Sequence, residues 1–187
     1  MTDTKTALLD SAERAARTRG IDGFSFADLS LEVGIRKPSI HYHFATKGTL
    51  TLALVQRYRI QMDVACVDID SANPTGGARI AALVAVYRQA LNGGTSLCLC
   101  VALSASRESL PAEVITQIGL YRQTMITWLV DAFAAGQSDG SITDLRAPQD
   151  EAPATLSLLE GAQLSARAAE DVAIFDAATR LLLARVS

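Results

Sequence analysis

The segment from Ser25 to Phe44 constrains the fold more than any other part of the sequence, because it holds two short helical patterns around one glycine. Ser25 suits an N-cap, and Asp28 three residues later makes a pair like a capping box. Gly34 supplies the backbone freedom for a tight turn, and Pro38 suits the first turn of the second pattern. Two short helices joined in this way form a helix-turn-helix motif.

The remaining sequence also has helical periodicity. Among 187 residues, of which 49% are hydrophobic, Val, Ile and Thr form no alternating blocks, so helices rather than strands are expected. A first helix is expected from Thr4 to Arg19, with Gly20 as its stop. A later apolar stripe with the spacing of one helix face comprises Ile80, Leu83, Val84, Tyr87 and Leu91.

Further helices are expected towards the C-terminus. A short one covers 96–106, a longer one opens at Pro111, and two final helices cover about 151–169 and 171–185, with a polar loop at 136–150. The sequence therefore predicts an all-α protein. It has a three-helix helix-turn-helix domain at residues 1–46 and a second helical domain at residues 47–187.

Charge is distributed unevenly between the two ends of the chain. Residues 1–60 carry nine Lys and Arg against six Asp and Glu, whereas residues 61–187 carry eight against fourteen. A basic N-terminal segment before an acidic remainder indicates that only residues 1–60 bind a polyanion. No apolar run reaches the roughly 18 residues that span a membrane, and the N-terminus lacks the apolar region of a signal peptide. A cytoplasmic protein is expected, and its odd number of cysteines (Cys66, Cys98 and Cys100) indicates reduced thiols.

The two histidines, His41 and His43, allow three interpretations. A shared metal ion is disfavoured, because residues two apart on a helix point in nearly opposite directions and no cysteine or carboxylate completes a ligand set. Acid–base catalysis lacks a partnered nucleophile or a positioned carboxylate. The sequence thus implies no metal and no cofactor. The third interpretation, a surface that binds DNA, gives a role to almost every residue of the segment.

In the DNA-binding interpretation, apolar residues hold the two short helices together and polar residues face outwards. The apolar set is Val33, Ile35, Ile40 and Phe44, and the outward set is Arg36, Lys37, Ser39, His41 and His43. Such side chains bond phosphates and base edges, while Pro38 offers apolar contact to a thymine methyl group. Lys47, in the first turn of a fourth helix that Thr46 caps, can hold a phosphate.

Residues 5–50 closely resemble the DNA-binding domain of the TetR/AcrR family of bacterial transcriptional regulators. The matching residues read GFSFADLSLEVGIRKPSIHYHFATKGTL, which follow the family pattern of a glycine turn and a Tyr/His-rich second helix. The resemblance implies an all-helical homodimer with an effector-binding C-terminal domain, usually a repressor. It also implies phosphate contacts at Ser25 and Lys47, and a groove-facing set at Lys37, Pro38, Ser39, His41 and His43.

Three positions differ from the family pattern or add to it. His41 replaces the usual tyrosine, so a phosphate contact becomes sensitive to pH. Arg36 replaces a capping serine or threonine, which removes a cap but adds a cation at the groove. Tyr42 is expected to pack between helices rather than to contact DNA.

The last two expected helices look like those that form a four-helix dimer interface in members of the family. Their small residues, Gly161, Ala162, Ser165 and Ala166, allow close helix approach. Packing within one chain is the alternative explanation.

The segment GTSLCLCVALSAS is similar to that of family members that sense electrophiles, such as the N-ethylmaleimide reductase repressor, and Cys98 falls at the reactive position. Cys98 is equally compatible with a core position. Reversible binding of an apolar effector would use Tyr87, Cys98, Tyr121, Met125 and Trp128. The main prediction is a ligand-responsive DNA-binding regulator that is not an enzyme. The alternatives are a helical enzyme with a C-terminal thiol pocket and a protein–protein adaptor.

Overall fold

The computed structural model describes residues 3–144 and 146–187, and every regular element within those ranges is a helix, as the sequence predicts. The chain forms two compact units, which are described separately. One unit comprises the residues up to Ile60 together with Leu99–Leu120. The other comprises Gln61–Cys98 and Tyr121–Ser187. No helix in the described ranges is long and apolar enough to cross a membrane.

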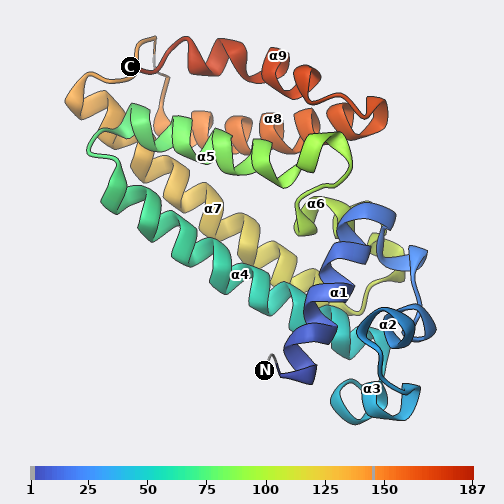
Figure 1. The fold of residues 1–187 in the computed structure, drawn as a ribbon. Helices are drawn as coiled ribbons and strands as arrows, with labels where there is room; N and C mark the ends of the chain where they lie inside the picture. Colours follow the sequence, from blue (N-terminus) through green and yellow to red (C-terminus); the bar gives the residue numbers. More distant parts are fainter. Residues whose placement is uncertain (1–2, 145) are drawn as a thin grey trace. The chain divides into compact units, whose positions relative to one another are not determined.

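The first unit contains the helix-turn-helix segment and the helices around it (Figure 1). Its elements are α1 (Thr4–Arg19), a 3₁₀ turn (Ile21–Gly23), α2 (Phe26–Val33), α3 (Lys37–His43), the first part of α4 (Lys47–Ala72), α6 (Leu99–Ser104), a 3₁₀ turn (Arg107–Ser109) and the start of α7 (Ala112–Asp139). The predicted bounds of α1 are confirmed: Leu8 and Ala12 are buried on one face, and the chain leaves the helix at Gly20, where φ is 78°. α6 packs against α1.

The second unit contains the remaining parts of α4 and α7 together with α5 (Gly76–Ala90), a 3₁₀ turn (Asn92–Gly94), α8 (Pro148–Ala169) and α9 (Val172–Leu183). Helices α5, α8 and α9 lie side by side (Figure 1). The predicted stripe from Ile80 to Leu91 is buried in this unit. The buried residues of the other helices include Tyr121, Met125, Leu129, Phe133, Leu156, Leu159 and Phe175.

Helix α7 is longer than expected, because the loop predicted from Gly136 begins only after Asp139. The segment stays helical because it meets the start of α5. A Cβ atom on Gly76 would lie 2.1 Å from the backbone N of Gly136, and the Asp139 carboxylate accepts a 2.8 Å hydrogen bond from the Gly76 N–H. Leu145, in the rest of the expected loop, lies outside the described residues.

The compact units do not follow the expected division between residues 46 and 47. Helix α4 does begin at Lys47, and the Thr46 hydroxyl accepts a 3.1 Å hydrogen bond from the Thr49 N–H as its cap. However, both α4 and α7 continue from one compact unit into the other, and α6 belongs to the unit that contains α1. The division of functions between residues 1–46 and 47–187 therefore stays a prediction.

Candidate functional site

The expected capping box at the start of α2 is present. The Ser25 hydroxyl accepts hydrogen bonds from the N–H groups of Ala27 and Asp28 at 3.2 and 3.4 Å, and the Asp28 carboxylate accepts one from the Ser25 N–H at 2.7 Å. The hydrogen bonds from Ser25 hold the pKa of the Asp28 carboxyl below its ordinary value. Ser25 is exposed, so its hydroxyl lies at the surface as well as at the helix end. The predicted phosphate contact at Ser25 stays a prediction.

The turn between α2 and α3 has the geometry that its glycine allows. Gly34 has a φ of 73°, in the left-handed region that favours glycine, and the Ser30 hydroxyl donates a 2.5 Å hydrogen bond to the Ile35 carbonyl. Arg36 precedes α3 without a side-chain cap, and Pro38 lies in its first turn, both as the sequence predicts. The turn thus fixes α3 against α2 with its N-terminal residues at the surface.

Helix α3 divides into a buried and an exposed side. Ile40 and Phe44 are buried, with exposed fractions of 0% and 4%. Among the residues predicted to face DNA, Arg36, Lys37, Pro38, Ser39 and His41 are exposed, and His43 is half-buried. The His41 ring lies edge-on to Phe26 with centroids 5.1 Å apart, and its Nδ1 lies 3.3 Å from the Ala45 carbonyl oxygen. The predicted α3 residues are thus exposed or half-buried around the buried Ile40, and their contact with DNA stays a prediction.

Tyr42 corrects one sequence prediction. It was expected between helices, but it is 86% exposed. Residues two apart on a helix differ by about 200° in direction. Because Ile40 and Phe44 both point inwards, Tyr42 between them must point outwards. We call Arg36, Lys37, Pro38, Ser39, His41, Tyr42 and His43 together the α3 face. The centroid of the Tyr42 ring lies 5.2 Å from that of the His43 ring, in an edge-on arrangement.

Lys47 is held at the junction of α1 and α2. Its ammonium group donates a hydrogen bond to the Phe24 carbonyl and lies 4.4 Å from the centroid of the Phe24 ring. Burial lowers the pKa of this half-buried lysine, an effect that the nearby Asp22 and Asp28 oppose. Lys47 therefore ties the start of α4 to Phe24. A phosphate contact from the same residue stays a prediction.

Two of the predicted effector residues meet in the interior of the second unit. The hydroxyl groups of Tyr87 and Tyr121 are 2.8 Å apart and share a hydrogen bond, and both side chains are 2% exposed. Met125, one turn beyond Tyr121 on α7, is also buried. These three residues provide an apolar interior with one polar pair.

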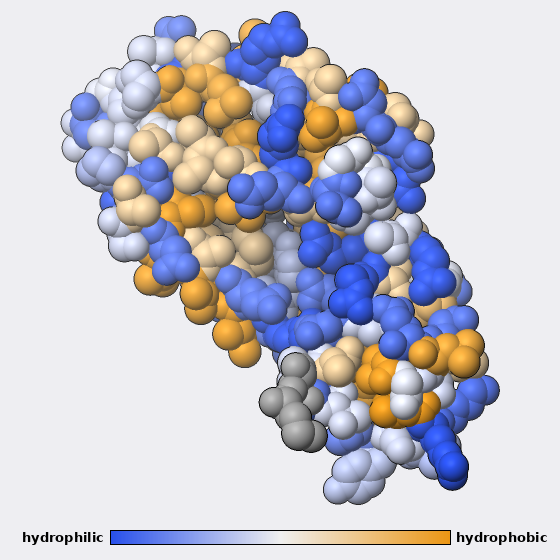
Figure 2. Space-filling view, in the orientation of Figure 1, coloured by the Kyte–Doolittle hydropathy of each residue, from blue (hydrophilic) through white to orange (hydrophobic). Residues whose placement is uncertain are grey.

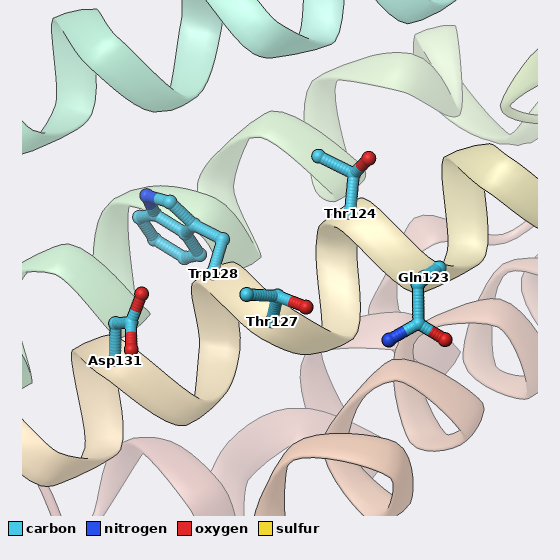
Figure 3. Close-up of a pocket in the computed structure, with 5 residues that line it drawn as sticks. All are labelled: Gln123, Thr124, Thr127, Trp128 and Asp131. Atoms are coloured by element: carbon cyan, nitrogen blue, oxygen red, sulfur yellow. The ribbon is translucent and has the colours of Figure 1, made fainter.

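Trp128 lies in a different setting. Its indole N–H donates a 3.1 Å hydrogen bond to the Asp70 carboxylate. It lines an open groove of about 330 Å³ with other α7 side chains, as Figure 3 shows. These are Gln123, Thr124, Thr127 and Asp131. The groove is a surface feature of α7, whereas Tyr87 and Tyr121 are buried.

Cys98 is buried, but it is not on the short helix as expected, because α6 begins at Leu99. The Cys98 N–H donates a 3.0 Å hydrogen bond to Oε1 of Gln163 on α8, and this bond holds the residue before the helix. Gln163 was not among the residues predicted from the sequence; it is 0% exposed and donates from Nε2 to the Tyr87 carbonyl at 2.7 Å. A single amide within the small-residue run of α8 was the only indication.

Cys66 and the possible metal ligands are the remaining reactive side chains. Burial, with smaller effects of Asp70 and Asp63, raises the pKa of the Cys66 thiol to about 12, so this thiol is protonated at neutral pH and is a poor nucleophile. Within the ranges that the structure describes, no three His, Cys, Asp or Glu residues lie close enough together to hold a metal ion.

Comparison with known proteins agrees with this geometry. Residues 8–54 match the sequence model of the bacterial regulatory proteins of the tetR family. No curated protein sequence matches. A TetR-family transcriptional regulator from Agrobacterium tumefaciens has 28% sequence identity and a TM-score of 0.92 over 98% of this chain and 97% of that one.

Two further structures share the fold. The reduced form of NemR from E. coli is 23% identical, with a TM-score of 0.84 over 100% of this chain and 98% of that one. AibR in complex with isovaleryl coenzyme A and operator DNA is 17% identical, with a TM-score of 0.69 over 87% of this chain and 86% of that one. The helix-turn-helix and its exposed α3 face define a DNA-binding transcriptional regulator. Residues 8–54 carry the tetR-family sequence match, and the fold of the chain is similar to that of a TetR-family transcriptional regulator.

Proposed function

We propose that the protein is a ligand-responsive repressor that binds a near-palindromic operator duplex as a homodimer. The observation that carries this proposal is the α3 face, where exposed polar and aromatic side chains lie over the buried Ile40 and Phe44. A helix of this construction enters the major groove with its polar side towards the bases. A partner on chromosomal DNA implies that the protein works in the cytoplasm.

The residues of the DNA-binding surface have different roles. Ser25 and Lys47 contact phosphates and set the position of the domain on the duplex. Lys37, Pro38, Ser39, His41 and His43 face the groove, and Arg36 adds a cation that changes the base preference. Tyr42 joins this set, because its exposed ring can stack against the sugar–phosphate backbone or a thymine methyl group.

Helices α8 and α9 form the dimer surface. Leu158, Leu164 and Leu181 are 36%, 46% and 80% exposed, and exposed small residues such as Gly161 lie between the leucines of α8. A groove of about 220 Å³ between the two helices is lined by Leu158 and Leu181, and a side chain of a second copy would fill it. A two-fold dimer would present two α3 helices, which suits an inverted repeat.

The effector binds in the interior near Tyr87, Tyr121 and Met125, where the tyrosine pair offers hydrogen bonds in an apolar setting. Trp128 belongs to this site only if the groove on α7 is part of it.

A thiol-reactive effector acting at Cys98 is the second possibility. In that case N-ethylmaleimide releases DNA from the wild type but not from Cys98→Ser, and mass spectrometry locates the adduct at Cys98. An adduct confined to Cys66 or Cys100 would exclude the thiol mechanism.

Selection from random duplexes tests the proposal as a whole. We expect the purified protein to enrich an inverted repeat whose half-sites lie about 34–36 Å apart, or a multiple of that distance. Retention should fall steeply with salt, because phosphate contacts release counterions. A pool without any inverted repeat would contradict the repressor function, and salt-independent retention would point to an adaptor rather than a DNA-binding protein.

A further inference from the structure

Gln163 on α8 is a fully buried amide with both ends engaged. Its Oε1 accepts a hydrogen bond from the Cys98 N–H at 3.0 Å, and its Nε2 donates one to the Tyr87 carbonyl at 2.7 Å. These partners fix the orientation of the amide, because exchanging its nitrogen and oxygen would place a donor against a donor and an acceptor against an acceptor. We call the two hydrogen bonds the Gln163 clasp.

The clasp connects the end of one helix to the start of the next. Tyr87 lies in the last turn of α5, and the N–H of Leu91, four residues later, bonds to the Arg88 carbonyl. Cys98 immediately precedes α6. One side chain thus satisfies two buried backbone groups on either side of the α5–α6 connection.

The clasp also lies where the chain passes from one compact unit to the other. Cys98 is the last residue of its segment in the second unit, and Leu99 begins α6 in the first. Within the first unit α6 packs against α1, which precedes the helix-turn-helix. A change in where α6 begins therefore acts on the unit that carries the α3 face.

Tyr87 belongs to both the clasp and the expected effector site. Its hydroxyl group bonds to Tyr121, and its carbonyl group bonds to Gln163. A ligand that separates the two tyrosine rings displaces Tyr87 and strains the clasp. Both hydrogen bonds share one amide, so a displacement of Tyr87 that turns this amide also weakens its bond to Cys98. Because Gln163 holds both the last turn of α5 and the residue before α6, loss of these bonds lets the end of α5 and the start of α6 move.

We propose that Gln163 is the positioning residue through which ligand entry beside Tyr87 and Tyr121 resets the start of α6 and releases DNA. This inference rests on the proposed repressor function. The closed clasp belongs to the DNA-binding arrangement, because the tyrosine contact that a ligand must break is intact when the clasp is closed. Opening the clasp by substitution therefore mimics the effector.

Gln163→Glu offers a test that a purely structural role does not mimic. A protonated glutamic acid retains the clasp, since its hydroxyl group donates to the Tyr87 carbonyl and its carbonyl group accepts from the Cys98 N–H. The ionised carboxylate has no proton to donate and repels the Tyr87 carbonyl. Burial raises the pKa of such an acid, so the clasp opens as the pH rises.

The variants and the wild type share the other ionisable groups near the clasp. The effects of those groups therefore cancel in the ratio of variant to wild-type DNA affinity. On the elements that meet α8 here they are Tyr87 and Arg88 of α5, Cys98, Tyr121 and Arg122 of α7, and Asp176 of α9. Arg88 pairs with Asp176 at 2.6 Å, and Arg122 pairs with Glu160 of α8 itself. Each variant is therefore compared with the wild type at the same pH.

The experiment measures the affinity for the duplex that the wild type selects. From about pH 5.5 to about pH 8.5, across which a buried carboxyl group titrates, Gln163→Glu should start at the wild-type affinity and fall about tenfold below it. Gln163→Met, which cannot form the clasp, should be about tenfold weaker throughout. Gln89→Glu, the same substitution at an exposed position of α5, should follow the wild type.

Helix content and sedimentation at each pH accompany the affinities. The inference is overturned if Gln163→Glu follows the wild type at every pH, if Gln163→Met binds within about twofold of the wild type, or if affinity falls only where helices or dimers are lost. Faster amide exchange in the peptide containing Cys98, in Gln163→Met alone, would support it independently. A wild type that binds no duplex would contradict the proposed function instead, which is a distinct result.

Discussion

The α3 face and the interior around Tyr87 hold their polar groups in opposite ways. On α3, side chains such as Lys37 and Ser39 are exposed and stay hydrated until DNA replaces the water. In the interior, the Tyr87 and Tyr121 hydroxyls bond to each other, and Gln163 bonds to backbone groups on two segments. An exposed contact can be gained or lost by itself at modest cost, whereas a buried one must be exchanged for an equivalent bond. DNA binding should therefore weaken continuously as salt is added or single contacts are removed, and the ligand response should be all-or-none.

The α3 face lies over buried residues, and substitutions of Phe44 and Tyr42 distinguish the buried side of α3 from its exposed side. Phe44→Ala removes a ring that is 4% exposed, which should cost about 3–5 kcal/mol of stability. Tyr42→Ala removes a ring that is 86% exposed, so stability should change by less than about 0.5 kcal/mol while operator affinity falls about fivefold. Urea unfolding and DNA titration measure the two quantities. Equal stability losses in both variants would contradict the division between the buried and exposed sides.

The dimer surface extends the comparison to exposed apolar residues. Leu181 on α9 and Val67 on α4 are 80% and 66% exposed, and Figure 2 shows hydrophobic residues gathered along the edge of α4. Only the α9 residue lies in the proposed interface. Leu181→Asp should give monomers and weaken operator binding by about 100-fold or more, because the second half-site no longer acts together with the first.

Val67→Asp is the matched control for Leu181→Asp and should remain dimeric in sedimentation at the same concentration. Dissociation of the Val67→Asp variant, with Leu181→Asp unchanged, would move the interface from α8 and α9 to α4.

Sequence alone predicted the features of the α3 face that depend on neighbours along the chain. The Ser25 capping box, the Gly34 turn and the burial of Ile40 and Phe44 all arise within a few residues. Tyr42 was misassigned although the helical angle between it and Ile40 already excluded a shared direction. An aromatic residue in an apolar neighbourhood was given more weight than its position on the helix.

The interior was less predictable because its bonds join distant parts of the sequence. Gln163 meets Cys98 and Tyr87 across 65 and 76 residues, and no local pattern indicates which backbone groups a buried amide will satisfy. The hydrogen bond from the Cys98 N–H to Gln163 also holds Cys98 before α6. The prediction that Cys98 lies on the helix was therefore wrong because of a contact with a residue distant in sequence. Likewise α7 continues to Asp139 because that carboxylate caps α5, a partner that the polar sequence GQSD does not reveal.

Lys47 combines a predicted phosphate contact with a structural hydrogen bond to the Phe24 carbonyl. If the lysine reaches a phosphate, Lys47→Ala should weaken binding almost equally for all sequences and reduce the salt slope by about 1 per site. The comparison variant, Lys37→Ala, should instead change which bases are tolerated. Because the Lys47 ammonium also bonds to the Phe24 carbonyl, a loss of stability with an unchanged salt slope would leave it only the structural role.

The smallest expected effect concerns the capping box of α2, where a charged group contributes at the surface. The hydrogen bonds from Ser25 lower the pKa of the Asp28 carboxyl in the folded state. A carboxyl group with a depressed folded pKa stabilises the protein above its unfolded pKa and loses that contribution as the pH falls through the folded value. Asp28→Ala should therefore lower the urea midpoint slightly at neutral pH, and the difference from the wild type should vanish in acid, below the lowered folded pKa of Asp28. Asp22→Ala, at an exposed carboxylate outside the box, provides the control. If the Asp28→Ala difference persisted unchanged in acid, ionisation of the Asp28 carboxyl would not be the source of the stabilisation.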